Sequence, residues 1–173
     1  MSLGELAAIA ISVLALVLSW VSYSRSRHKE QAEFFSNLYE RFFFSSQFSD
    51  IKHALDWKTS SRDLLLRYVS GEAPNLKSYS VFEDFTRDTL LISSFTDYLN
   101  FFVLLSYLIK KKQLSREDVV NGFGYYLQQL NSLLDESPHF RRYLENGDDG
   151  FKLVLELLER TRTSVAKRYS TKQ

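Results

Sequence analysis

The three histidines are the residues of this chain best suited to bind a metal ion or transfer a proton, but their spacing suits neither task. His28, His53 and His139 lie far apart in the sequence, and none belongs to an HExxH segment. The chain has no cysteine, and therefore no thiolate ligand and no disulfide. We predict no metal site and no cofactor.

Two glycines come closest to a phosphate-binding loop. Gly122 and Gly124 lack the preceding strand and the third glycine that such a loop requires. No serine lies in a GxSxG segment, which would mark a nucleophile on a sharp turn. The sequence therefore predicts a protein that is not an enzyme.

Basic side chains form several groups that could meet an anion. Three interpretations stay open: a solvated surface, contact with anionic lipid headgroups, or binding of an anionic nucleotide. The net charge of only +1 does not indicate strong binding to nucleic acid. The candidate residues are Lys110, Lys111, Lys112, Arg141, Arg142, Arg160 and Arg162.

Asp97 and Asn100 are polar residues in a very apolar segment, Thr89 to Ile109. They lie one helical turn apart and therefore share a face. We predict that both are buried. A buried carboxylate needs a partner, such as Arg67 or Arg87. The functional alternative is a ligand or gating contact.

The elements that must position these residues start with an apolar segment near the N-terminus. From Leu6 to Tyr23 no side chain except tyrosine is ionisable, and a basic cluster follows at once. This length meets the roughly 18-residue threshold for a membrane-spanning helix, and the charge order favours a retained anchor over a signal peptide. We predict a transmembrane helix over residues 1–24. Residues 25–173 form a cytoplasmic helical domain, with the N-terminus outside a bacterial inner membrane.

Small and polar residues fall on one face of the predicted transmembrane helix. In lipid, such a face lets helices approach closely, so it predicts a homo-oligomer. Two alternatives stay open: a pore lined by this face, with Glu5 at its outer mouth, and a monomeric anchor. We call this face the seam, and its members are Gly4, Glu5, Ala8, Ser12, Ala15, Ser19 and Ser22.

The remaining sequence predicts an all-α fold. No proline or glycine lies between Arg25 and Phe44, so the first helix is expected to run for about 40 residues. Capping boxes are predicted at Ser80 with Glu83 and at Ser115 with Asp118. Thr89 to Ile109 is predicted to be a core helix rather than a second span, because a second crossing would carry the following lysines outside.

Residues 95–130 combine an LNFF run, a KKK turn and the pattern VxxxFGYY. This segment resembles a family of small bacterial single-pass membrane proteins with a helical cytoplasmic domain. The layout is similar to membrane accessory proteins encoded beside CRISPR effectors, some of which form pores in anti-phage defence. The family resemblance implies an architecture and not a reaction. The likeness in layout alone suggests an accessory or effector in defence, with a defence-system protein as partner, and the seam predicts that it is oligomeric. The alternatives are a receptor for an anionic nucleotide second messenger and a membrane scaffold.

Overall fold

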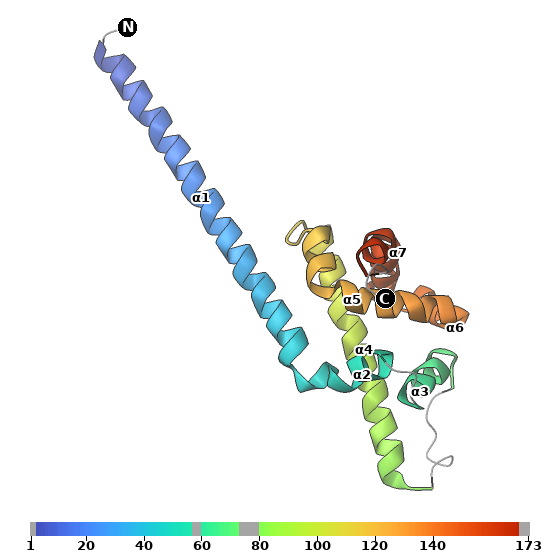
Figure 1. Ribbon diagram of the computed structural model, residues 1–173. Coiled ribbons are helices and arrows are strands. Elements are labelled where there is room, and N and C mark those ends of the chain that lie inside the picture. Colours follow the sequence, from blue (N-terminus) through green and yellow to red (C-terminus); the bar gives the residue numbers. More distant parts are fainter. Residues whose placement is uncertain (1–2, 57–59, 73–79, 170–173) are drawn as a thin grey trace. The chain divides into compact units, whose positions relative to one another are not determined.

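The computed structural model describes residues 3–56, 60–72 and 80–169 (Figure 1). Side chains are described from Leu14 onward, apart from those of residues 17, 24, 25, 27, 28, 47, 168 and 169. The described residues form α-helices and one 3-10 helix and contain no strand, which confirms the predicted all-α class. The chain divides into two compact units, Met1–Arg41 and Phe42–Gln173. The boundary predicted between residues 24 and 25 is a different one, because it marks the end of the predicted transmembrane helix. It stays a prediction.

The first unit consists of the greater part of one helix. Helix α1 spans Leu3–Phe44, 42 residues without a break, as the uninterrupted sequence predicts. Several of its large apolar side chains are exposed, with exposed fractions from 59% to 73% at Leu14, Leu16, Leu18 and Trp20. The last three residues of α1 belong to the second unit.

Within the described residues, only α4 (Phe82–Lys110) is both long and apolar enough to cross a membrane. The apolar helical stretch Leu14–Tyr23 in α1 is shorter. Half of the most apolar part of α4 is buried inside the protein, as in the core helix of a helical domain. The predicted span over residues 1–24 falls largely on side chains outside the described set, so it stays a prediction.

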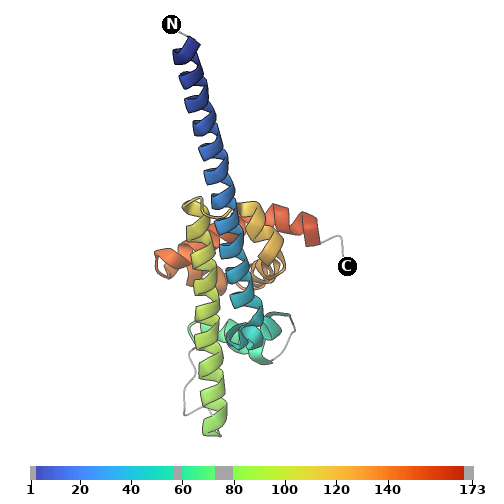
Figure 2. The same ribbon diagram turned by 90° about the vertical axis from the view of Figure 1, so that its left-hand side faces the viewer.

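The second unit packs its helices along and across α4 (Figures 1 and 2). Helix α7 contacts α4, α5 and α6, and α2 and α3 also pack against α4. The described elements that accompany α4 are the 3-10 helix η1 (Ser46–Phe48), α2 (Ser49–Asp56), α3 (Ser60–Val69), α5 (Arg116–Glu136), α6 (Pro138–Asn146) and α7 (Asp149–Tyr169).

Helical spacing of apolar residues explains why α4 and α7 meet. In α4 the buried side chains recur every three or four residues, which places them on one side of the helix. In α7 the fully buried Val154 and Leu158 share a face with the nearly buried Val165. The buried residues of α4 are Ile92, Phe95, Tyr98, Leu99, Phe101, Phe102, Leu105, Ser106 and Leu108.

Local sequence explains the start of α5 and the end of α3, but not the start of α4. The capping box at Ser115 is confirmed, since the Asp118 amide donates to the Ser115 hydroxyl at 3.0 Å. Gly71 follows α3 with a φ of 96°, a conformation that favours glycine. The box predicted at Ser80 is wrong. Helix α4 begins one residue later than predicted, so Val81 takes the cap position and makes no side-chain bond there.

A buried arginine ties three helices together. Arg62 in α3 is only 5% exposed and donates hydrogen bonds to the Leu55 carbonyl and to the Glu136 carboxylate, each at 2.7 Å. Its Nε has no hydrogen-bond partner. The Glu136 side chain is 43% exposed, so the arginine bears most of the desolvation in this ion pair.

We predict that Glu136→Ala lowers the free energy of unfolding by about 3 kcal/mol, because it leaves the buried guanidinium without a counter-charge. Adding Arg62→Met should recover part of this loss. Urea unfolding of the detergent-solubilised full chain, followed by far-UV circular dichroism, measures both. Glu145→Ala is the control, because its exposed pair with Arg141 at 3.9 Å should contribute less than about 1 kcal/mol. Equal losses in the two single variants would contradict a structural role for the buried pair.

Candidate functional site

The last turn of α1 is built into the core of the second unit. Phe42 is fully buried, and its ring centroid lies 4.7 Å from that of Phe101 and 5.0 Å from that of Tyr126. Aromatic pairs in tilted and edge-to-face arrangements contribute beyond their buried area. We call this group of rings the aromatic clamp: Phe42, Phe43, Phe48, Tyr98, Phe101, Phe102, Phe123 and Tyr126.

Lys52 caps the C-terminus of α1 from helix α2. Its ammonium donates to the Phe42 and Phe43 carbonyls, each at 3.3 Å. It also lies 5.5 Å from the centre of the Phe42 ring, within cation–π range. Burial lowers the pKa of Lys52, and the nearby Asp56 carboxylate partly opposes this shift. The ammonium thus satisfies carbonyls that a helix end otherwise leaves without partners.

One hydroxyl in the aromatic clamp has no partner. Tyr98 is fully buried and its OH makes no hydrogen bond. Burial is the largest cause that raises the pKa of Tyr98 well above the ordinary value of 10.0. Electrostatic repulsion from Tyr126, Asp56 and Tyr125 adds to the shift. An unpaired buried hydroxyl destabilises the fold, because it loses its bonds to water without replacement.

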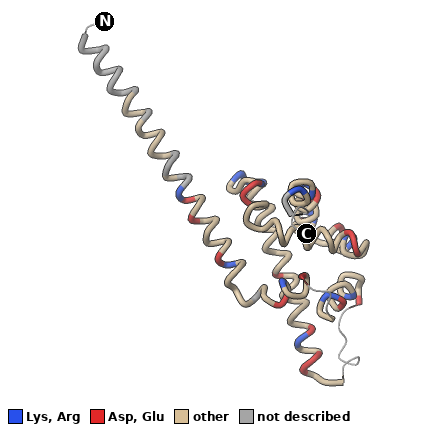
Figure 3. Tube along the Cα trace, in the orientation of Figure 1, with Lys and Arg blue, Asp and Glu red and all other residues tan. Residues whose placement is uncertain are grey.

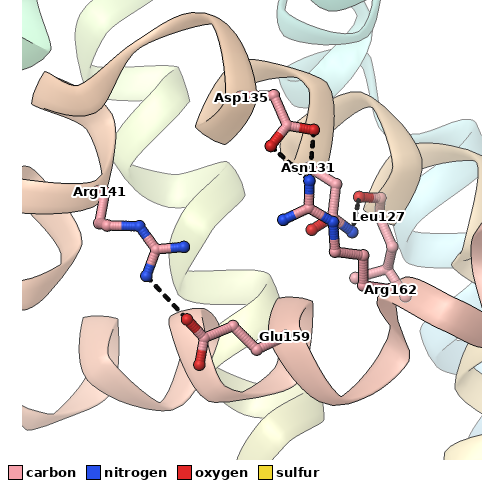
Figure 4. A network of polar contacts seen from close by, with 6 residues as sticks. All are labelled: Leu127, Asn131, Asp135, Arg141, Glu159 and Arg162. Atoms are coloured by element: carbon pink, nitrogen blue, oxygen red, sulfur yellow. Dashed lines mark hydrogen bonds and ion pairs between the residues drawn. The ribbon is translucent and has the colours of Figure 1, made fainter.

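Most of the predicted anion-binding arginines are paired within the domain. Figure 3 shows acidic and basic residues along the same helices of the second unit. Arg141 donates to Glu159 at 2.8 Å, and Arg162 donates to both carboxylate oxygens of Asp135 (Figure 4). These pairs join α6 to α7 and α5 to α7. Arg141 and Arg162 therefore serve helix packing in this structure.

A different set of cations lines a cavity of about 440 Å³. Lys110 from the end of α4, Arg116 from the start of α5 and Arg160 from α7 all contribute to it. Among the described lining residues, Glu156, 3.3 Å from Arg160, is the only acidic one. We call this the cationic cavity; its remaining lining residues are Ser106, Ile109, Leu153 and Leu157.

The cationic cavity contains two predicted candidates, Lys110 and Arg160, and one residue that sequence reasoning missed. Arg116 was missed because it lies outside the basic clusters, although its position after the capping Ser115 could have placed it at a helix N-terminus. Arg142 lines a separate cavity, and Lys111 lies 5.4 Å from the Tyr107 ring centre. The predicted basic groups therefore do not converge on one site.

The prediction that Asp97 and Asn100 are buried is wrong. Both side chains are exposed in the second unit. The buried face of α4 includes Tyr98, Leu99 and Phe102, and the helical turn carries Asp97 and Asn100 away from it. The buried polar side chains of the described residues are instead Arg62, Ser106, Asn131, Ser137 and Thr161.

The predicted seam is described only in part. The side chains of Gly4, Glu5, Ala8 and Ser12 lie outside the described residues. Those of Ala15, Ser19 and Ser22 are exposed along α1. In the described part of the chain, no three histidine or carboxylate side chains lie close enough together to hold a metal ion.

Comparison with protein-family models, with curated proteins and with solved structures finds no match to this chain. The resemblance to small single-pass membrane proteins and to defence-associated accessory proteins stays a prediction.

We predict that Tyr98→Phe stabilises the protein by about 1 kcal/mol, because it removes a buried hydroxyl without a partner. The gain should grow as the pH rises above 10. There an unfolded tyrosine ionises, whereas the folded Tyr98, whose pKa is raised, stays protonated and lowers the stability of the wild type. Urea unfolding at pH 8 and at higher pH measures the difference. A destabilised Tyr98→Phe variant would contradict the absence of a partner.

Proposed function

We propose that the protein is a non-enzymatic, membrane-anchored helical protein that self-associates through α1 and displays its second unit in the cytoplasm. The segment from Leu6 to Tyr23 has no ionisable side chain except tyrosine. Exposed Leu16 and Trp20 support burial of this segment in lipid, since large apolar side chains gain when removed from water. The basic residues from Arg25 to Lys29 favour a cytoplasmic location for the rest of the chain.

The observation that carries the proposal is the uninterrupted course of α1. The helix has no proline after residue 3 and no break before Phe44. No flexible linker therefore separates the proposed anchor from Phe42, which the aromatic clamp buries. A continuous helix is suited to pass a change in the second unit to the membrane segment, whereas a flexible linker would absorb it.

Self-association rests on the seam. Small side chains allow close approach of helix backbones in lipid, and serine hydroxyls can hydrogen-bond across the contact. A pore lined by the seam and a role in anti-phage defence are finer predictions that depend on such an assembly. The alternative is a monomeric anchor or scaffold. The next experiment distinguishes this alternative from self-association.

We predict that Ser12→Leu/Ser19→Leu reduces the detergent-extracted particle from an oligomer to a monomer, because leucine at the seam blocks close approach of the helices. Light scattering coupled to size-exclusion chromatography measures the protein mass of the particle. The control is Val13→Leu/Val17→Leu, which enlarges side chains on the opposite face and should leave the oligomer intact.

A monomeric wild type would overturn self-association and leave only the anchor. The anchor has its own test, because a spanning helix stays with membranes through an alkaline carbonate wash. Release of the wild type into the supernatant without detergent would contradict membrane anchoring.

A further inference from the structure

The cationic cavity lies entirely within the second unit and brings together segments distant in sequence. Lys110 ends α4, Arg116 opens α5, and Arg160 lies in the middle of α7. Its volume of about 440 Å³ falls within the range of small-molecule sites. The packing of three helices therefore sets its position.

The lining cations differ from the other candidate cations in their partners. Among the described side chains, Lys110 and Arg116 have no carboxylate within ion-pair distance. Arg160 is paired with Glu156, which lines the same cavity. Three cations and one carboxylate leave two positive charges without a partner in the cavity wall.

We propose that the cationic cavity binds a phosphate monoester group carried by a small ligand with an apolar portion. A phosphate monoester has a charge close to −2 at neutral pH, which complements the two uncompensated charges. Lys110 and Arg116 bind the phosphate oxygens through charge-assisted hydrogen bonds.

The apolar lining residues hold the rest of the ligand. Ile109, Leu153 and Leu157 present hydrocarbon beside the cations. Ser106 donates its hydroxyl proton to the Phe102 carbonyl at 2.7 Å, so its oxygen remains an acceptor for a ligand donor. This combination of an anion contact with an apolar wall favours a phosphorylated organic molecule over inorganic phosphate.

An adjoining cavity of about 680 Å³ leaves room for a longer ligand. Arg116 lines both cavities. The second adds Glu117, Val120 and Asn121 from α5, and Ser164 and Lys167 from α7. A ligand larger than the first cavity would extend past Arg116 toward α7. Both cavities lie within the second unit, so binding there does not depend on membrane anchoring.

The test uses the full chain in a neutral detergent at low ionic strength, titrated with phenyl phosphate and followed by calorimetry. Saturable binding is expected for the wild type. Lys110→Ala/Arg116→Ala should weaken it by a factor of at least ~10, the loss expected for charge-assisted hydrogen bonds. Phenol, which has the ring without the phosphate, should not bind.

The matched control is Lys111→Ala/Arg142→Ala, which removes the same charge from exposed positions outside the cavity. It should bind phenyl phosphate like the wild type. Thermal unfolding of both double variants checks that each is folded. If the two double variants weaken binding equally, or if the wild type binds neither this probe nor the lipid probe below, the proposal is overturned.

A second titration distinguishes a soluble ligand from a lipid headgroup. Dihexanoyl phosphatidic acid carries the same phosphate monoester on a short-chain lipid, and dihexanoyl phosphatidylcholine serves as its control. Binding of phenyl phosphate alone supports a soluble phosphorylated ligand, whereas binding of phosphatidic acid alone supports a lipid source. In either case the cavity variant must lose the binding, or the site is assigned wrongly.

Discussion

Burial of Phe42, in the last turn of α1, is the constraint on which the architecture of this protein depends. A helix end exposes carbonyl groups without partners, and in an apolar environment each of them is costly. Here Phe42 enters the core, and Lys52 donates to the Phe42 and Phe43 carbonyls. The ammonium thereby allows a helix end to lie among aromatic rings. Helix α1 continues without a break from the first unit to Phe44 in the second.

Helix α4 contributes to both features on which the proposals rest. Phe101 and Phe102 belong to the aromatic clamp, while Ser106 and Lys110, one to two turns further along, line the cationic cavity. Both features are therefore built on one helix whose buried face fixes its position in the core. A site on a rigid helix holds its side chains more precisely than one on a loop.

Local sequence signals predicted where most helices lie. They could not predict which side chains pair between helices. The absence of glycine and proline predicted the long α1, and Ser115 with Asp118 predicted the start of α5. Ion pairs such as Arg141 with Glu159 join residues 18 positions apart, so only the packed fold reveals that these cations are already neutralised. Asp97 was assigned to the core from the apolar character of its segment, but the segment buries mainly one face.

Amide hydrogen exchange across the end of α1 tests the central claim most directly. In the detergent-solubilised full chain, the amides of Phe42 and Phe43 should exchange as slowly as those of the buried residues Leu99, Phe101, Phe102 and Leu105 in α4. Such protection follows if the last turn is part of the core and opens only when the second unit unfolds. Exchange as fast as that of the turn residues Ser70 and Gly71 would contradict the account, because it would place a mobile break between α1 and the second unit.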